Sequence, residues 1–349
     1  MDTRIELRPG YRISRIIKGG WQLAGDHGEV EPGRAVADMS AFVDAGITTF
    51  DCADIYTGVE TLIGAFLARY RQERGADAAA AIKVHTKLVP DIDALPKVDR
   101  AYVEQIIDRS RARLGVERLD LVQLHWWDYA VPGCCEALGH LEALRQAGKI
   151  DRIGTTNFDL EHLQELRETG VDIVSVQSQY SLLDTRPAGA FATWCRANRV
   201  SILAYGVLAG GFLSDAWLGL PDPGHQFANR SLVKYRLIID EFGGWELFQA
   251  LLAVLREVAD RHGVTIANVA VRAMLDNPDV GAVILGARYA HHLPQNLASL
   301  AFRLDQEDRA GLDAVLAQRR GPSGPVYGLE RDRSGRHGRI MKYHLNTAG

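Results

Sequence analysis

Short apolar runs rich in β-branched residues recur along the chain, and a longer amphipathic stretch follows most of them. The apolar runs predict eight strands, at residues 13–18, 48–51, 81–87, 119–125, 150–155, 173–176, 202–204 and 282–285. Apolar residues spaced three or four apart predict helices at residues 34–45, 61–74, 101–114, 135–147, 160–169, 187–198, 245–262, 266–276 and 293–300. Strands that alternate with helices indicate right-handed crossovers and a parallel sheet.

The number of these units distinguishes between two parallel architectures. Eight units in 349 residues fit one closed barrel better than two open sheets. An open dinucleotide-binding sheet would also carry GxGxxG after its first strand, and Gly19-Gly20-Trp21 does not complete that pattern. We therefore expect one α/β domain over residues 1–349, folded as a (β/α)8 TIM barrel.

Two segments fall outside the repeat, an insertion at 213–244 and a tail at 319–349. One interpretation is that both segments are surface chain without a function. The functional interpretation is that they lie over the C-terminal face of the barrel, where long βα loops cover active sites. On that interpretation their aromatic residues and one histidine would close the pocket, namely Trp217, Phe227, Tyr235, Tyr327, Tyr343 and His344.

Composition excludes several classes of protein. With 40 basic and 44 acidic side chains, the chain lacks the basic excess of a nucleic-acid-binding protein. No apolar run approaches the roughly 18 residues of a membrane span, and the N-terminus has no apolar signal segment. The four cysteines form no CxxC pair, so no metal site is indicated. We expect a reduced, cytoplasmic protein, monomeric or homo-oligomeric, that binds neither nucleic acid nor membrane.

Polar residues follow the predicted strands, at the end of a barrel where catalytic residues cluster. Each also has a purely structural alternative. Asp51 could cap a turn, Lys87 could be a surface lysine with Lys83 as the other candidate for the site, and His125 could be a core histidine. Their occurrence on three successive strand ends indicates a site, and Tyr56 lies in the loop above it. Further polar or aromatic strand ends are Trp21, Thr155, Thr156, Asn157, Gln177 and Tyr205.

An Asp, a Tyr, a Lys and a His suit proton transfer to a carbonyl oxygen. A phenol with a pKa of about 10 is a poor acid at neutral pH, and an adjacent ammonium group lowers that pKa. Asp51 would keep Lys87 charged, and a neutral His125 would steer the carbonyl towards Tyr56. Because no side chain donates a hydride, a nicotinamide or similar cofactor is implied.

At these residues the sequence resembles the aldo-keto reductase superfamily. The matching segments are GGWQLAG (19–25), GITTFDCADIYTGVETLIG (46–64), HTKL (85–88), LDLVQLHWWD (119–128), GKIDRIGTTNFD (148–159), VQSQYSLLD (176–184), ILAYGVLAGGFL (202–213) and VILGARYAHHLPQNL (283–297). The resemblance implies a barrel that interconverts a carbonyl and its alcohol. It assigns the catalytic tetrad to Asp51, Tyr56, Lys87 and His125, with Tyr56 as the general acid or base.

The resemblance also implies a nicotinamide dinucleotide extended across the barrel mouth. It assigns the nicotinamide end to Thr156, Asn157, Gln177 and Tyr205, the pyrophosphate to Gly206, Leu208, Gly210 and Leu213, and the adenosine end to Gly286, Arg288, Gln295 and Asn296. A 2′-phosphate paired with Arg288 favours NADP(H) over NAD(H), and an ordinary surface arginine is the alternative.

The substrate side is assigned to three tryptophans, Trp21, Trp126 and Trp127, with core packing as the alternative for Trp127. Asp54 and Asp128 are expected to be solvated. Two other functions stay open. One is a cofactor-binding regulatory relative such as a potassium-channel β-subunit, and the other is a barrel isomerase or aldolase that uses Lys87 as a Schiff base.

Overall fold

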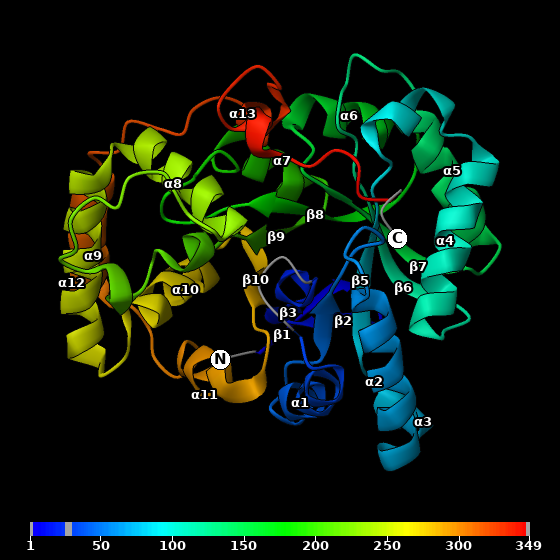
Figure 1. Ribbon diagram of the computed structural model, residues 1–349, viewed down its shortest axis with the longest axis horizontal. Helices are drawn as coiled ribbons and strands as arrows, with labels where there is room; N and C mark the ends of the chain where they lie inside the picture. Colours follow the sequence, from blue (N-terminus) through cyan, green and yellow to red (C-terminus); the bar gives the residue numbers. More distant parts are fainter. Residues whose placement is uncertain (1–2, 25–29, 347–349) are drawn as a thin grey trace.

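The computed structural model describes residues 3–24 and 30–346 and has a closed barrel of parallel strands at its centre (Figure 1). The barrel strands are β3 (Ile16–Gly19), β4 (Thr49–Asp51), β5 (Lys83–Leu88), β6 (Leu119–Leu124), β7 (Ile150–Thr156), β8 (Ile173–Gln179), β9 (Ser201–Tyr205) and β10 (Val280–Gly286). Each strand pairs with the next in sequence, and β10 pairs with β3 to close the ring. The predicted (β/α)8 TIM barrel is confirmed.

Helices surround the barrel and pack on its outer face (Figure 1). Those after the early strands are α1 (Pro32–Asp44), α2 (Val59–Arg74), α3 (Ala76–Ala80), α4 (Arg100–Leu114), α5 (Cys134–Gln146), α6 (Leu160–Glu168) and α7 (Ala190–Ala197). The later ones are α8 (Arg230–Phe242), α9 (Trp245–His262), α10 (Ile266–Asp276), α11 (Leu293–Ala298), α12 (Gln306–Leu316) and α13 (Gly328–Arg331). None of the helices in the described ranges is long and apolar enough to cross a membrane.

Local sequence explains where these helices begin and end. The Asp99 carboxylate caps α4 by accepting from the Tyr102 N–H, and Asp159 caps α6 in the same way. Gly115 ends α4 in the left-handed region, with φ of 65°. The strands between the helices are buried on both faces, β8 along its whole length.

The N-terminal segment differs from the prediction of a single strand over 13–18. β1 (Arg4–Arg8) and β2 (Tyr11–Ser14) form an antiparallel hairpin, and the barrel strand begins only at Ile16. Tyr11 and Ile13 are buried against residues from inside the barrel. Charged and apolar residues alternate on both sides of Pro9-Gly10, which is the pattern of a hairpin. The prediction of a single strand over 13–18 did not include this hairpin.

Four helices were not predicted: the short α3 and α13, and the longer α8 and α12. α8 lies inside the 213–244 insertion, for which only surface chain or a loop over the barrel was expected. α12 follows the last predicted helix and begins at a capping box between Asp305 and Asp308. Together with α9 and α10, the helices α8 and α12 enclose a second apolar core beside the barrel.

Candidate active site

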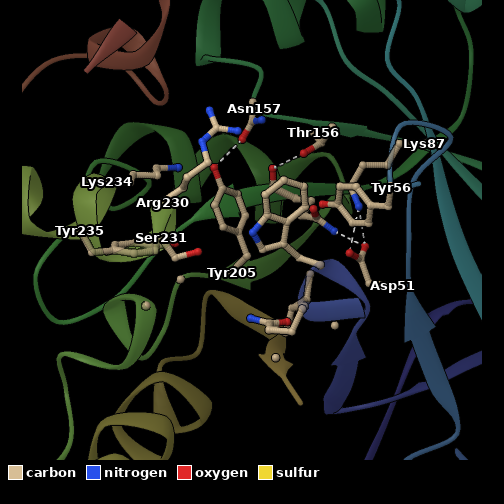
Figure 2. Close-up of a pocket in the computed structure, with 18 of the residues that line it drawn as sticks. Asp51, Tyr56, Lys87, Thr156, Asn157, Tyr205, Arg230, Ser231, Lys234 and Tyr235 are labelled. Carbon is tan, nitrogen blue, oxygen red and sulfur yellow. Dashed lines mark hydrogen bonds and ion pairs between the residues drawn. The ribbon is translucent and has the colours of Figure 1, made fainter. Parts of the chain in front are cut away.

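A cavity of about 420 Å³ opens at the C-terminal ends of the barrel strands. Seven strands and the residue that follows β6 contribute to its lining, through Gly19, Asp51, Lys87, His125, Thr156, Gln177, Tyr205 and Gly286. Figure 2 shows Asp51, Tyr56 and Lys87 gathered at one side, Arg230, Ser231, Lys234 and Tyr235 at the other, and Tyr205 between them. The polar strand ends that the sequence singled out are therefore brought together in one place.

The centre of the site is a buried ion pair. The Lys87 ammonium donates to both carboxylate oxygens of Asp51 at 2.9 Å and to the Cys52 carbonyl at 2.7 Å. Burial lowers the pKa of Lys87, but Asp51 and Tyr56 outweigh it, so the net pKa is raised. Lys87 is therefore charged at neutral pH, as the sequence analysis expected. Gln177 Nε2 donates to Asp51 at 2.6 Å and fixes the carboxylate from the other side.

Tyr56 lies beside this pair, with the Lys87 Nζ 5.0 Å from the centroid of its ring. Burial raises the pKa of the Tyr56 phenol, and Lys87 opposes that rise. The predicted lowering of this pKa by Lys87 is present, but the effect of burial is larger and the net pKa is raised. Lys83, the alternative candidate for the site lysine, lies at the opposite end of β5 from Lys87. It pairs with Asp120 of β6 and lies outside the cavity lining.

His125 follows β6 and has a single hydrogen-bonding partner on its ring. Its Nδ1 lies 3.2 Å from the Thr156 carbonyl oxygen, while Nε2 is buried and has no partner within the described residues. Burial, with the nearby Arg331 and Lys87, lowers the pKa of His125 to about 3. The imidazole is therefore neutral at physiological pH.

The residues assigned to the nicotinamide end meet in one corner. Asn157 has a left-handed backbone, with φ of 65°, and its Oδ1 accepts from the Tyr205 hydroxyl at 2.8 Å. The Thr156 hydroxyl donates to the Gln177 carbonyl oxygen at 3.3 Å. The side-chain amide nitrogen of Asn157 has no protein partner within the described residues, whereas the side-chain amide nitrogen of Gln177 donates to Asp51.

The glycines after β9 come close to helix α8. Gly206 has φ of 72°, and a Cβ there would lie 2.3 Å from the Tyr235 hydroxyl. Leu208 and Gly210 also line the cavity. Leu213 does not, because its side chain is buried in the second core.

Of the residues assigned to the adenosine end, only Gly286 lines the cavity. Arg288 is half-buried, and its guanidinium has no hydrogen-bond partner in the described part of the chain. Gln295 is exposed and donates to the Thr265 hydroxyl at 3.2 Å, and Asn296 lies on the same short helix outside the cavity. The structure therefore leaves these three positions beside the cavity, not in it.

Two of the three tryptophans lie where the resemblance assigned them. Trp21 packs edge-on against Tyr56 at 4.9 Å between ring centroids, and Trp127 packs edge-on against His125 at 4.3 Å. Trp126 does not reach the pocket: it is fully buried, and its indole N–H donates to the Val131 carbonyl at 2.9 Å. Successive residues of extended chain point in opposite directions, so Trp126 faces the helices when its neighbours face the mouth.

Both Asp54 and Asp128 were expected to be solvated. Asp128 is half-exposed, but the expectation is wrong for Asp54. Asp54 is buried and accepts from the Val89 N–H at 3.2 Å. Burial, with a smaller effect of Glu60, raises the pKa of Asp54 to about 8. Asp54 therefore lies under the site without lining it.

The insertion and the tail both reach the cavity, through two of their aromatic residues. Tyr235 of α8 and Tyr327 of the tail line it, and Tyr343 packs on Trp127 at 5.1 Å. Trp217 and Phe227 instead pack against Phe212 in the second core. His344 is exposed and lies 3.6 Å from Asp93.

Sequence reasoning missed three lining residues of α8, Arg230, Ser231 and Lys234, because it missed the helix. The available signal was Asn229, whose side chain accepts from the Ser231 N–H as an N-cap, followed by cations four residues apart. Lys234 Nζ lies 5.2 Å from the centroid of the Tyr205 ring. This side of the cavity is therefore cationic.

The tail is fastened to the mouth by buried charges. The Glu330 carboxylate accepts from the Arg186 guanidinium at 2.9 and 3.1 Å, and Lys234 Nζ lies 4.0 Å from it. Burial raises the pKa of Glu330, but these two cations outweigh it and bring that pKa from 4.5 to about 2. The next residue, Arg331, donates to the Asn157 carbonyl at 2.9 Å. The tail thus touches residues on both sides of the cavity.

Comparisons with known proteins agree with this geometry. A sequence model of the aldo/keto reductase family matches residues 15–317. Flagellar radial spoke protein 5 of Chlamydomonas reinhardtii is 32% identical over 260 residues, which are 64% of this chain but only 49% of that protein, so the chain spans about half of that relative's length. Aldo-keto reductase YhdN of Bacillus subtilis is 25% identical over 310 residues, which are 88% of this chain and 91% of the relative.

The fold is also found among solved structures. The glycerol dehydrogenase AKR11B4 from Gluconobacter oxydans has a TM-score of 0.76 at 24% identity, over 93% of this chain and 98% of that chain. At that identity the likeness concerns the fold. The family model, which covers most of the chain, confirms the resemblance found in the sequence: the chain belongs to the aldo/keto reductase family.

Proposed function

We propose that the protein is an NADP(H)-dependent oxidoreductase that interconverts an aldehyde, ketone or keto-sugar and the corresponding alcohol. The observation that supports this most directly is the buried Asp51–Lys87 pair beside Tyr56, at the base of a cavity large enough for small ligands. The relative named as an aldo-keto reductase and the family model support the same reaction class.

In reduction, Tyr56 gives its phenolic proton to the carbonyl oxygen. The phenolate left behind is stabilised by the Lys87 ammonium, which Asp51 keeps charged and in place. In oxidation the same phenolate takes the proton from the alcohol. Such positioned acid–base catalysis contributes roughly 10²–10⁴ in rate. A bound nicotinamide supplies the hydride that the carbonyl carbon receives, as is general in this family.

The donor set of the cavity fits such a dinucleotide. Asn157 presents a free amide N–H to a carboxamide, and Tyr205 presents a ring on which the nicotinamide can stack. At the other side, Arg230, Ser231 and Lys234 offer two cations and a hydroxyl group to the pyrophosphate. Arg288 lies beside the cavity and has no partner in the described chain, so it would pair with a 2′-phosphate and favour NADP(H), with NAD(H) as the other outcome.

A regulatory protein that binds the cofactor with little turnover is the second candidate. The observation in its favour is the tail, since the buried Arg186–Glu330 pair beside Lys234 would slow the release of a bound nucleotide. We expect a cytoplasmic protein in either case, because all four cysteines are free, including the adjacent Cys134 and Cys135. Its ligand is a small carbonyl compound or alcohol, and the protein is monomeric or homo-oligomeric.

The test is a fluorescence titration with NADPH and with NADH, followed by a panel of carbonyl compounds monitored at the nicotinamide absorbance band. Binding with repeated turnover supports the oxidoreductase. Tight binding without turnover supports the regulatory candidate. A covalent adduct trapped on Lys87 by borohydride, formed without any nicotinamide, would replace both with the Schiff-base enzyme.

A further inference from the structure

A second cavity opens on the N-terminal face of the barrel, at the opposite end from the candidate active site. Its volume is about 700 Å³. Strand β1, the starts of β9 and β10, and the segments that precede those two strands form the walls of this basal cavity. Pockets that hold small molecules commonly measure about 300–1,000 Å³, so the basal cavity has the size of a ligand site.

The lining of the basal cavity is cationic. Three carboxylates line it, those of Glu6, Asp276 and Asp279. Against them stand six guanidinium groups, those of Arg8, Arg15, Arg196, Arg199, Arg272 and Arg303. The whole chain has a net charge of −4, so the charge of this lining is opposite in sign to that of the chain. Charges of one sign around a concave surface focus their field and attract ions of the other sign.

Two of these arginines hold the walls in place. Arg8 donates to both carboxylate oxygens of Asp172, at 2.7 and 2.9 Å, and to the Arg199 carbonyl oxygen at 2.6 Å. Arg15 donates to the Leu275 carbonyl oxygen at 2.8 Å. These bonds join the N-terminal segment to the segments that precede β9 and β10, so the fold itself fixes the shape of the basal cavity.

On the α10 side, positive charge exceeds negative charge. The Asp276 carboxylate is shared by two cations, since it accepts from the buried Arg272 at 2.6 Å and from Arg309 at 2.9 Å. Burial lowers the pKa of Arg272 and Asp276 opposes that fall, but Arg303 and Arg309 add to it, and the net pKa is lowered. The neighbouring cations therefore repel one another more than the carboxylate attracts them, and an added anion would relieve that repulsion.

Two arginines at the rim are available to such an anion. The side chains of Arg199 and Arg303 are exposed, and neither has a hydrogen-bond or ion-pair partner among the residues that the structure describes. Arg199 follows α7 with φ of 57°, a position where glycine is usual, so the local turn does not account for an arginine. Arg196 of the same helix pairs with Asp279 at 3.1 Å and is 64% exposed.

We propose that the basal cavity binds a small organic phosphate, whose phosphate oxygens pair with Arg199 and Arg303. A guanidinium group offers a fork of N–H donors that matches phosphate oxygens. A phosphate group alone fills only a small part of the volume, and the organic part of the ligand would lie against Ile5, Ala192 and Val200. This site is separate from the mouth of the barrel and does not depend on the proposed function.

Binding is tested by isothermal titration calorimetry of the wild type with inorganic pyrophosphate at low ionic strength. We expect a Kd that rises with added NaCl, because salt screens exposed charges. In Arg199→Gln/Arg303→Gln the Kd should rise at least about tenfold, since two charge-assisted pairs are lost. The control matched for charge is Arg71→Gln/Arg74→Gln on the exposed face of α2, whose Kd should stay within about twofold of wild type.

A variant of the mouth shows which cavity holds the pyrophosphate. Arg230→Gln removes a cation from the mouth, and binding at the base should survive it. A rise in Kd in Arg230→Gln but not in Arg199→Gln/Arg303→Gln would place the ligand in the mouth and overturn the proposal. Equal rises in the two double variants, or no heat of binding in the wild type, would also overturn it.

Chemical modification locates the site without any substitution. Phenylglyoxal reacts with accessible guanidinium groups, and mass spectrometry of the peptides reports each arginine separately. Pyrophosphate well above its Kd should slow the modification of Arg199 and Arg303 at least about fivefold, because occupancy approaches completeness, and should leave Arg71 unchanged. Modification of Arg199 and Arg303 at the rate seen without pyrophosphate would refute the site.

Discussion

The substitution Glu330→Gln removes the buried negative charge that holds the tail, because it replaces one carboxylate oxygen by an amide NH2 group. The wild-type carboxylate is fully buried and is held by Arg186 and Lys234. Its pKa falls from 4.5 to about 2 in the folded protein, and a depression of that size corresponds to about 3 kcal/mol. The amide keeps the shape of the side chain but removes the charge that both cations share. Arg186 is then left with Asp184 alone and Lys234 loses its nearest carboxylate, so most of that free energy should be lost.

The expected change in melting temperature follows from the length of the chain. Unfolding entropy of about 2.1 cal/mol/K per residue over 349 residues turns 3 kcal/mol into a fall of about 4 °C in Tm at neutral pH. Because the folded pKa of Glu330 is depressed, the stabilisation is present above about pH 4.5 and lost as pH falls towards about 2. The difference between wild type and variant should therefore shrink in acid.

The assay is thermal unfolding at neutral pH and at about pH 3, together with limited proteolysis of residues 320–346. Glu257→Gln is the matched control, because Glu257 is exposed on α9 and its Tm should change by less than about 1 °C. A Tm of Glu330→Gln that equals wild type at neutral pH, with no faster cleavage of the tail, would refute the reasoning.

Three further substitutions address the chemistry. Tyr56→Phe should lower kcat by at least about 10²-fold while the Kd for NADPH stays within about twofold, and normal turnover would refute the proton-transfer role. Lys87→Met should be as inactive and should also lower Tm, because removing one partner of a buried pair costs roughly 3–5 kcal/mol. An active Lys87→Met enzyme would contradict the lysine-assisted phenol. Arg288→Ala should weaken NADPH at least about tenfold more than NADH in a binding titration, and equal losses would remove the 2′-phosphate assignment.

The barrel and the centre of the site were predictable because they depend on short-range patterns. Asp51, Lys87 and His125 each follow an apolar run, and strand ends meet at one face of a barrel whatever the details of packing. Trp126 was assigned wrongly because the family match covers a run of residues, whereas the extended backbone sends alternate side chains to opposite sides. No pattern of residue types reports that alternation after a strand has ended.

The cationic side of the cavity was missed for a different reason. Helix α8 lies in the insertion at 213–244, which was interpreted as surface chain or as a loop over the barrel, so no helix was expected there. The role of Glu330 depends on Arg186, which lies 144 positions earlier in the chain. A single sequence holds no trace of such a pairing, because neither residue has an unusual local context.

The order of synthesis gives the tail a further consequence. Residues 327–345 leave the ribosome after every barrel strand, since β10 ends at Gly286. Their contacts reach far back along the chain, 144 positions to Arg186 and 174 to Asn157. Long loops of this kind close late in folding, and domains fold as the chain emerges. The mouth of a nascent barrel is therefore uncovered until the tail has been made and packs over it. Chains stalled after residue 320 and pulsed with labelled nucleotide would show whether uptake precedes closure.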